Sequence, residues 1–485
     1  MSTNDRRRSA RPSAAAPATR RRARSRRGLR RFGISLSVVL VSLAAVGLAG
    51  AVATIVSGPR ITDVQVNPAA AAQASGARLI VTTSLPLEQV QVEQVQVEPA
   101  TEFAVDTAGR SVGVRFARPL WDDTEYTVTF SDVRGIGASN TATFSESFRT
   151  PAAEVFLLQR GGSSDDTIVR TDLVGAELEP IFKNQHIEDF RATNRYLVIS
   201  VRDDNDQAAL IVTDLDGQNP RELSLPGDGF VTHLQSADRG DRIGYTFTDR
   251  ELDETTGRES RLFTASLDRP EADPTPIELT GADPRVAEWR FVPDTDSILL
   301  LSFDGTLLLT DAVGEQATAL GAARAIDSIA RGSTDALVER VEGRVVIDLS
   351  DASATPLVAP DASLGPVGEV TALPGGGTIR LAADLDATGT PTGGTSVALV
   401  AVDGSTRPLL AVAQTDAVLQ ICPAPSARYA AVLVAPDVAT NRYDTYVLPI
   451  PGVVQTRIIE IDSGDQVGTL PGFDISWCRL PPSQS

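Results

Sequence analysis

The sequence between residues 152 and 480 repeats one order of short apolar segments, with a period of roughly 40 to 54 residues. In each unit a first segment, such as VAEWRF from Val286, is followed by a more hydrophobic second one, such as SILLLS from Ser297. A third segment usually ends in an acidic turn, as in IVTDLDG from Ile211, and a short fourth segment follows. In the last unit the third segment is expected at TYVLPIPG, Thr445–Gly452. Short segments of this kind, bounded by Gly, Pro and Asp, are typical of β-strands.

The units predict a closed ring of sheets. Each of the first three segment types occurs seven times. A unit of four strands is one blade of a β-propeller, so we predict a seven-bladed propeller over residues 152–480, with a C-terminal tail at 481–485; six or eight blades are the alternatives. The chain enters at the second strand of a blade, at Glu154, and ends on a first strand, Asp474–Leu480. The last strand can therefore complete the first blade, which removes the exposed edges of an open array.

Two motifs in the repeats resemble those of known propellers. Trp289 with Pro293-Asp294 is similar to a W-x-P-D-G corner, and Asp214–Gly217 is similar to a D-x-D-G turn. Both recur in TolB-like and related WD-repeat-like propellers. The resemblance implies the same fold for residues 152–480, although most other units depart from these motifs.

Residues 58–151 alternate polar and apolar side chains with a period of two, which is typical of an antiparallel β-sandwich. The expected strands are Arg60–Val66, Ala77–Thr83, Val90–Val97, Thr101–Asp106, Ser111–Ala117, Glu125–Phe130 and Thr141–Phe148. The segment resembles the bacterial Ig-like domains of S-layer and cell-wall proteins, which carry a "pL…tYtvtv" strand and a final "F-x-T". The matching residues are Leu120, Thr124, Tyr126, Phe148 and Thr150. The resemblance implies a spacer without catalytic residues, and a Tyr126 hydroxyl bound to backbone.

The N-terminus predicts a membrane anchor. Residues 1–31 are rich in Arg, Ser, Ala and Pro and are expected to be disordered. Residues 32–56 hold about 25 uncharged, mostly apolar residues, enough to span a hydrocarbon core of roughly 30 Å as a helix. The preceding arginines predict a cytoplasmic N-terminus. A signal peptide cleaved near Ala51-Val52-Ala53, or a twin-arginine signal at Arg30-Arg31, is the alternative. Each reading places residues 58–485 outside the cytoplasm.

The charge is divided unevenly along the chain. Twelve of the 44 basic residues but one of the 63 acidic residues lie in the first 31 positions, which leaves about 30 more acids than bases in the rest. Such a body repels nucleic acid and anionic lipid, so we expect a cell-envelope protein or a wall glycan as partner and no nucleic acid. Lys183 is the only lysine, and this arginine-rich composition suggests an actinobacterial source.

The two cysteines predict a disulfide. Cys422 and Cys478 hold the same position in two successive first segments, LQIC and ISWC. Disulfides persist outside the cytoplasm, and this one would join the last full blade to the closing strand. Two buried thiols too far apart to react are the alternative.

No catalytic motif is present. The chain lacks HExxH, CxxC, GxSxG, P-loop and Rossmann patterns, and its only histidines are His186 and His233. We expect no cofactor and no resident metal. Calcium is the exception to consider, because the loops at Asp203–Asp206 and Asp384–Gly389 are rich in the hard oxygen ligands that it prefers. Side chains on first segments are expected to line the propeller channel: His233, Glu288 and Glu369, with Glu188 and Asp189 as further carboxylates.

Three functions follow from these observations. The first is a membrane-anchored binding or scaffold protein of the cell envelope, not an enzyme, whose propeller recruits a protein or a wall polymer. The second is an extracytoplasmic hydrolase or lyase that acts on carbohydrate or peptide with channel carboxylates. The third is a sensor whose basic tail engages a cytoplasmic partner. The order of anchor, spacer and platform, without a catalytic motif, favours the first.

Overall fold

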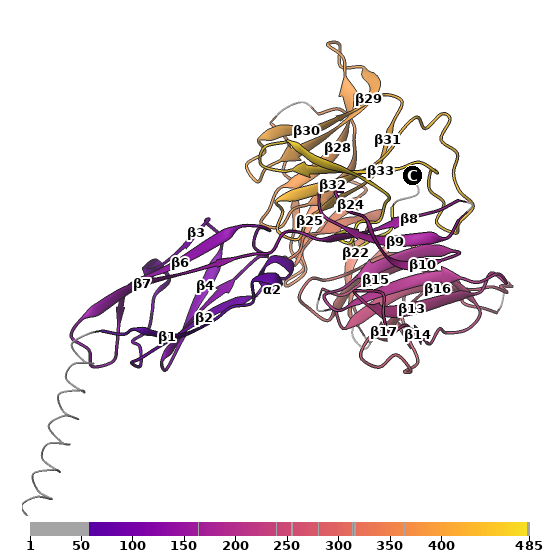
Figure 1. Ribbon diagram of the computed structural model, residues 1–485. Coiled ribbons are helices and arrows are strands. Elements are labelled where there is room, and N and C mark those ends of the chain that lie inside the picture. The colour runs from indigo at the N-terminus through magenta and orange to yellow at the C-terminus, as the bar shows by residue number, and fades with distance from the viewer. Residues whose placement is uncertain are drawn as a thin grey trace, which may run out of the picture.

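The computed structural model describes residues 58–482, except residues 163, 239, 254–255, 280, 313, 315–316 and 362–363. The described chain is all-β apart from two short helical segments, and it forms a small sandwich followed by a larger body of seven sheets (Figure 1). The predicted tail at 1–31 and span at 32–56 lie outside the described residues. Within the described part, no helix combines the length and the apolar character needed to cross a bilayer.

The sandwich packs a four-stranded sheet against a three-stranded sheet. The first has the order β1 (Ile61–Gln65), β2 (Arg78–Thr83), β5 (Ser111–Phe116), β4 (Phe103–Ala108), and the second β3 (Val95–Glu98), β6 (Glu125–Arg134), β7 (Thr141–Arg149). Alternate residues face the core, which is centred on Phe116, Leu120, Tyr126 and Phe130. The Tyr126 hydroxyl accepts a hydrogen bond from the Trp121 backbone N–H at 2.9 Å, as a corner tyrosine does.

The sandwich differs from the sequence-based expectation at two places. A helix, α2 (Pro68–Gln73), lies between the first two strands; the Asn67 side chain caps it and Pro68 starts it. The strand expected over Val90–Val97 begins only at Val95, because residues 92–94 form a 3₁₀ turn, η1 (Val92–Gln94).

The larger body consists of seven successive antiparallel sheets, six with four strands and the first with three. Their strands are β8–β10 (Val155–Gln159, Asp166–Thr171, Glu179–Asn184), β11–β14 (Ile187–Ala192, Tyr196–Arg202, Ala208–Asp214, Arg221–Leu223), β15–β18 (Gly229–Ser236, Arg242–Asp249, Arg261–Ser266, Thr275–Pro276), β19–β22 (Val286–Phe291, Ser297–Ser302, Thr306–Asp311, Ala317–Ala322), β23–β26 (Ala325–Ile329, Asp335–Arg340, Gly343–Asp348, Ala354–Pro356), β27–β30 (Val367–Ala372, Thr378–Leu385, Pro391–Val400, Thr406–Val412) and β31–β34 (Ala417–Pro423, Tyr429–Ala435, Gln455–Glu460, Gln466–Pro471).

The sheets are the blades of a β-propeller. The first strands β11, β15, β19, β23, β27 and β31 contact one another in succession. Apolar clusters fill the space between neighbouring blades; one joins Val198 of β12 to Tyr245 of β16. Trp289 of β19 lies so close to Gly244 of β16 that a Cβ there would be 2.6 Å from its ring. The predicted propeller is therefore confirmed, and it has seven sheets.

The C-terminal segment takes the place of the missing first strand in the three-stranded blade. The backbone N–H and carbonyl of Phe473 both bond to Leu158 of β8, at 3.0 and 2.9 Å, and the Ser476 N–H donates to the Phe156 carbonyl at 3.0 Å. The pairing is shorter than the strand expected over Asp474–Leu480. Asp474 has a positive φ of 55°, and a turn brings the Cys478 N–H to the Ile475 carbonyl, so the chain bends out of the ladder.

An expectation about the last blade was wrong. The segment Thr445–Gly452 (TYVLPIPG) was expected as the third strand of the last blade, but the third strand is β33. Pro449 and Pro451 lack the N–H that a strand in the middle of a sheet must donate. Residues 436–454 instead form a long loop, the strap, which reaches the first two blades.

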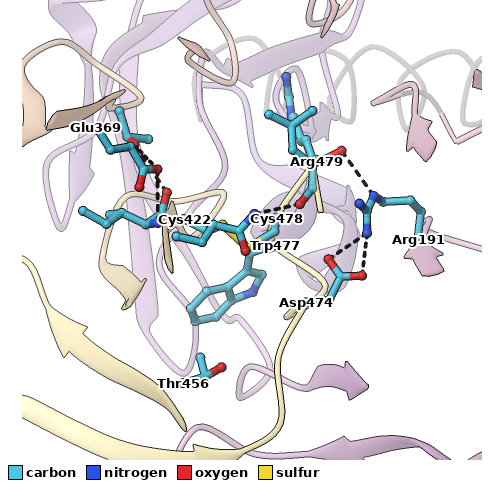
Figure 2. Close-up of a disulfide and its surroundings, with 12 residues drawn as sticks. Arg191, Glu369, Cys422, Thr456, Asp474, Trp477, Cys478 and Arg479 are labelled. Atoms are coloured by element: carbon cyan, nitrogen blue, oxygen red, sulfur yellow. Dashed lines mark hydrogen bonds and ion pairs between the residues drawn. A yellow bond between two sulfur atoms is a disulfide. The ribbon is translucent and has the colours of Figure 1, made fainter. Parts of the chain in front are cut away.

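Cys422 of β31 and Cys478 of the closing segment form a disulfide, with Sγ atoms 1.97 Å and Cα atoms 5.3 Å apart (Figure 2). The bond joins the last blade to the segment that completes the first, across 56 residues of sequence. It therefore lies at the one seam where the propeller is held by non-consecutive parts of the chain.

The sandwich docks on the propeller through its end that carries α2 (Figure 1). The Ser75 hydroxyl donates to Asp294 Oδ2 at 2.6 Å, and Arg428 Nη1 donates to the Asp122 carbonyl at 2.8 Å. The Arg428 guanidinium also lies over the Trp121 ring, 5.6 Å from its centroid. Asp294 and Arg428 belong to turns that join the first and second strands of their blades. We call the face formed by these turns the sandwich face.

Replacing both cysteines with serine removes the covalent clasp. We expect the free energy of unfolding to fall by about 3–4 kcal/mol, the loop-entropy effect of opening a closure of this length, without loss of the β-rich circular dichroism spectrum. Chemical denaturation of the oxidised wild type and of the Cys422→Ser/Cys478→Ser variant measures it. Equal midpoints and slopes would contradict the assignment of a stabilising clasp.

Candidate functional site: the propeller channel

A cavity of about 110 Å³ lies at the axis of the propeller, lined by the first strands of five blades and by the closing segment. Most of its polar lining residues come from first strands. They are Gln235, Ser236, Arg290, Asp327, Ser328, Glu369, Thr371 and Gln420, joined by Arg331 from the turn after β23 and Arg479 from the closing segment. The cavity meets the sandwich face, because Ala330, Pro374 and Ala424 of its rim lie in the same kind of turn as Asp294 and Arg428.

Most polar side chains around the axis bond to the next blade. Arg191 Nε donates to the Leu234 carbonyl at 2.8 Å, and Gln235 Nε2 donates to the Trp289 carbonyl at 2.6 Å. The Thr371 hydroxyl reaches the Ile421 carbonyl at 3.3 Å in the same way. Since buried polar atoms need partners, these residues satisfy backbone carbonyls that no sheet ladder reaches. The ring of polar residues thus holds neighbouring blades together.

The channel carboxylates take part in the same bonding. Glu288 Oε2 accepts from the Ile326 backbone N–H at 2.9 Å, and Glu369 Oε1 accepts from that of Ile421 at 3.2 Å. Glu369 lines the cavity, whereas Glu288 and His233 lie outside its lining. His233 is turned aside at a bulge in β15, with a φ of 50°, and its Nδ1 lies 3.1 Å from the Thr246 hydroxyl. Burial, with help from nearby Arg290, lowers the pKa of His233.

Asp189 belongs to a buried ion cluster at the closure. Arg191 lies between Asp189 and Asp474, with nitrogen–oxygen distances of 2.8 and 2.7 Å. Figure 2 shows its contact with Asp474 and its hydrogen bond to the Arg479 carbonyl. All three charged side chains are buried. Burial raises the pKa of Asp189 despite the attraction of Arg191. Asp189 therefore ties β11 to the closing segment and is not a free channel group.

Glu188 lies near the start of β11 and outside the lining of the cavity. Its carboxylate accepts from His186 Nε2 at 2.7 Å and from Arg202 Nη1 at 3.1 Å, and from the Val447 N–H of the strap at 3.1 Å. These bonds outweigh the effect of burial, and the pKa of Glu188 is lowered. Of the five channel candidates from the sequence, the structure therefore brings only Glu369 into the cavity.

The cavity combines a weakly acidic carboxyl with several guanidinium groups. Burial raises the pKa of Glu369 to about 7, with nearby Asp327 contributing. Asp327 pairs with Arg344 at 2.9 Å, while Arg331 and Arg479 both pair with Asp238. Burial lowers the pKa of Arg479 to about 10. Burial also lowers the pKa of Arg290. Glu369 can thus hold or release a proton near neutral pH, but no histidine is among the described residues that line the cavity.

The described residues hold no group of three or more His, Cys, Asp or Glu side chains arranged to bind a metal ion. In the two acidic loops the carboxylates are used locally. Asp203 Oδ1 accepts from the backbone N–H of Asn205 and Gln207, and Asp386 Oδ1 accepts from those of Thr388 and Thr390. The carboxylates at the centre of these loops therefore shape the loops themselves.

Sequence reasoning missed the arginines and glutamines of the cavity. Gln235 and Arg290 hold the position that Cys422 and Cys478 hold in the later units, one residue after a core position. An alignment of the repeats would have grouped them, and the cysteines mark the position that faces the axis. Arg479 carried no such signal, because it follows the bend in the closing segment.

No protein-family model matches the chain, and no curated protein matches it. Solved structures to which it is similar include an oligogalacturonate lyase in complex with manganese, at 11% identity over 80% of this chain and 98% of that chain, with a TM-score of 0.44. Another is the putative TolB from Agrobacterium tumefaciens, at 13% identity over 68% and 98%, TM-score 0.35. A third is the β-propeller domain of Cps50 (Swd1) from Myceliophteria thermophila, at 12% over 60% and 89%, TM-score 0.39. Similarity this distant carries no argument about function, and the fold assignment rests on the seven sheets.

The buried carboxyl of Glu369 predicts a pH dependence of stability. Its folded pKa of about 7 exceeds its ordinary value of 4.5, so the folded chain holds a proton that the unfolded chain releases between these values. Stability should therefore fall as pH rises from about 4.5 to 7. In Glu369→Gln this part of the decline should vanish, because the amide oxygen can still accept from Ile421 and has no charge to bury.

The measurement is the melting temperature of wild type and variant between pH 4.5 and 8.5. Glu288→Gln is the matched control, because Glu288 accepts an equivalent backbone amide outside the cavity, and it should keep the wild-type slope. Parallel curves for wild type and Glu369→Gln would show that Glu369 is not the group responsible.

Proposed function

We propose that the protein is a membrane-anchored, extracytoplasmic binding or scaffold protein of the cell envelope, whose propeller recruits a protein or a wall polymer. The observation that carries this proposal is the Cys422–Cys478 disulfide at the seam of the propeller. A structural disulfide persists in an oxidising compartment and is rare in the cytosol. The apolar segment 32–56, preceded by arginines, supplies the route to that compartment and the anchor.

The order of the parts supports a platform held away from a membrane. The sandwich follows the anchor segment directly, and it is hydrogen-bonded to the propeller at the turns that contain Asp294 and Arg428. Arg428 binds the backbone carbonyl of Asp122, and burial raises the pKa of the Asp122 side chain to about 6. A sandwich in this place acts as a spacer, as the resemblance to Ig-like wall domains implies. Because the sandwich contacts the sandwich face of the propeller, the opposite face points away from it.

The bonding of the channel supports binding over catalysis. Catalysis needs groups that are free to act on a substrate, whereas Arg191, Gln235, Glu288 and Thr371 each hold the next blade. Binding proteins place their working groups on surface loops carried by a rigid scaffold, and a propeller with cross-bonded blades is such a scaffold.

The position and the pKa of Glu369 favour one alternative function, that of a hydrolase or lyase that acts on a substrate in the cavity. A carboxyl group with a pKa of about 7 beside Arg290 could give a proton to a leaving group or take one from a substrate. In that case Glu369→Gln would abolish turnover of a wall glycan or peptide by the purified chain, and Glu288→Gln would not.

Affinity capture from intact cells tests the proposed function. The full chain with a C-terminal tag is crosslinked in cells, purified, and compared with a chain that ends at residue 151. We expect specific envelope proteins or wall polymer on the full chain and not on the shorter one. Purified full chain that turns over wall glycan or peptide, with no retained partner, would replace the binding proposal with the catalytic one.

A further inference from the structure

The two faces of the propeller differ in the length of their loops. On the sandwich face the turns between first and second strands hold three to five residues, as at 193–195 and 330–334. On the opposite face, loops between second and third strands include residues 250–260 and the strap at 436–454. We call this opposite face the free face, and it consists of the second-to-third-strand loops and the connections between blades. It is the face on which the sandwich makes none of its described contacts.

Exposed apolar side chains collect on the free face. Ten large hydrophobic side chains of the propeller are exposed among the described residues, and three of them, Val174, Leu178 and Val402, lie in turns between third and fourth strands, at the same end of the sheets as the sandwich face. Six others lie in second-to-third-strand loops of the free face: Leu252, Phe303, Val341, Val438, Tyr443 and Val453. Val358, in a connection between blades, packs instead against Gly404, in the turn that holds Val402. Tyr443 and Val453 are each 57% exposed. Val438, Tyr443 and Val453 come from one loop, the strap, in which the Asn441 side chain donates to the Val453 carbonyl and Tyr443 pairs with Pro451. Exposed apolar side chains gathered in one place are typical of a binding surface.

The strap holds three of these side chains on a fixed support. Arg160 Nη1 forms a largely buried ion pair with Asp444 Oδ2 at 2.7 Å, and its guanidinium stacks 3.8 Å from the centre of the Tyr446 ring. The His186 ring stacks on the same tyrosine at 4.0 Å. Glu188 accepts the backbone N–H groups of Val447 and of its neighbour Leu448. Because the strap is ordered before binding, little conformational entropy remains to be lost when Tyr443 contacts a partner.

The charge around these apolar side chains is acidic. Exposed basic residues in the described loops of this face are Arg324 and Arg442, whereas the exposed acids are far more numerous. They are Asp165, Asp203, Asp204, Asp228, Glu251, Asp253, Glu259, Asp304, Glu342, Asp386 and Asp437. The half-buried arginines Arg250, Arg258 and Arg285 are each paired with a carboxylate of the same face. An acidic rim of this kind attracts a partner of opposite charge and sets its orientation.

We propose that the free face binds a protein partner that presents apolar side chains surrounded by basic residues. This inference rests on the proposed binding function and adds the face and the chemistry of the partner. Val438, Tyr443 and Val453 of the strap provide the apolar contacts, and the acidic loops provide the complementary charge. A neutral glycan would use the aromatic side chains but would gain nothing from the acids, so the charge favours a protein.

Site-specific photocrosslinking in the full chain tests the assignment. The photoreactive amino acid p-benzoylphenylalanine replaces Val438 or Tyr443 of the strap on the free face, and Val174 or Val402 at the end of the sheets that holds the sandwich face as matched controls. We expect a discrete crosslinked protein from the free-face positions only. That protein is then purified and titrated against full-length variants at low and high salt.

Two triple variants separate the faces. Val438→Ser/Tyr443→Ser/Val453→Ser should weaken binding of the crosslinked protein at least tenfold, because it removes the apolar contacts of the strap. Val174→Ser/Leu178→Ser/Val402→Ser should change it less than twofold. Raising the salt from 50 to 500 mM should weaken binding to the wild type, as expected for charge pairing.

Each other outcome overturns a defined part. Crosslinks from the sandwich-face positions, or equal binding by both triple variants, would contradict the face assignment and leave the binding function intact. Retention of insoluble wall polymer without a crosslinked protein would overturn the protein partner. If the full wild-type chain retains neither protein nor polymer, the proposed function fails together with this inference.

Discussion

The propeller depends on the closure between its first and last parts. Six blades are built from consecutive strands, so each is held by its own hairpins, but the first blade is complete only when Phe473 pairs with Leu158. Backbone bonds at two residues make a short ladder for so large a ring. The buried Arg191–Asp474 pair and the Cys422–Cys478 disulfide reinforce it from both neighbouring blades. Breaking a buried ion pair by removing one partner is strongly destabilising, so the loss of Arg191 or Asp474 would weaken the seam.

The need to pair backbone groups at the axis explains the polar residues of the channel. A propeller buries the inner edge of each first strand, where backbone carbonyls such as those of Leu234 and Trp289 have no ladder partner. Side chains of the preceding blade satisfy them, and the polar residues at the axis are consequently structural. What remains open is a small cavity with one weakly acidic carboxyl, Glu369. The proposed binding surface therefore lies where side chains are exposed on a rigid support, as Tyr443 is on the strap.

Much of the fold could be predicted from the sequence because the repeat is a local signal. Segments such as Ser297–Ser302 are short, apolar and bounded by turn residues, and their order fixes which strands are neighbours. The strap could not be predicted, because it looks like a strand and is held by Arg160 and Glu188, more than 250 residues away in sequence. The position of Glu369 in the cavity followed from the repeat. His233 lies in the same bulge of its own strand, but its backbone has a φ of 50° and its ring lies against Thr246. The backbone torsion of a single residue and long-range ion pairs leave no periodic trace in a sequence.

The central claim is that the propeller is closed and stabilised by a disulfide, in a compartment that allows one. Peptide mapping under non-reducing conditions, on full-length protein alkylated in intact cells before lysis, tests it most directly. The account predicts a linked pair of peptides that contain Cys422 and Cys478, with little alkylation of either thiol. Recovery of both cysteines fully alkylated would contradict the claim, and with it the argument that residues 58–485 work outside the cytoplasm.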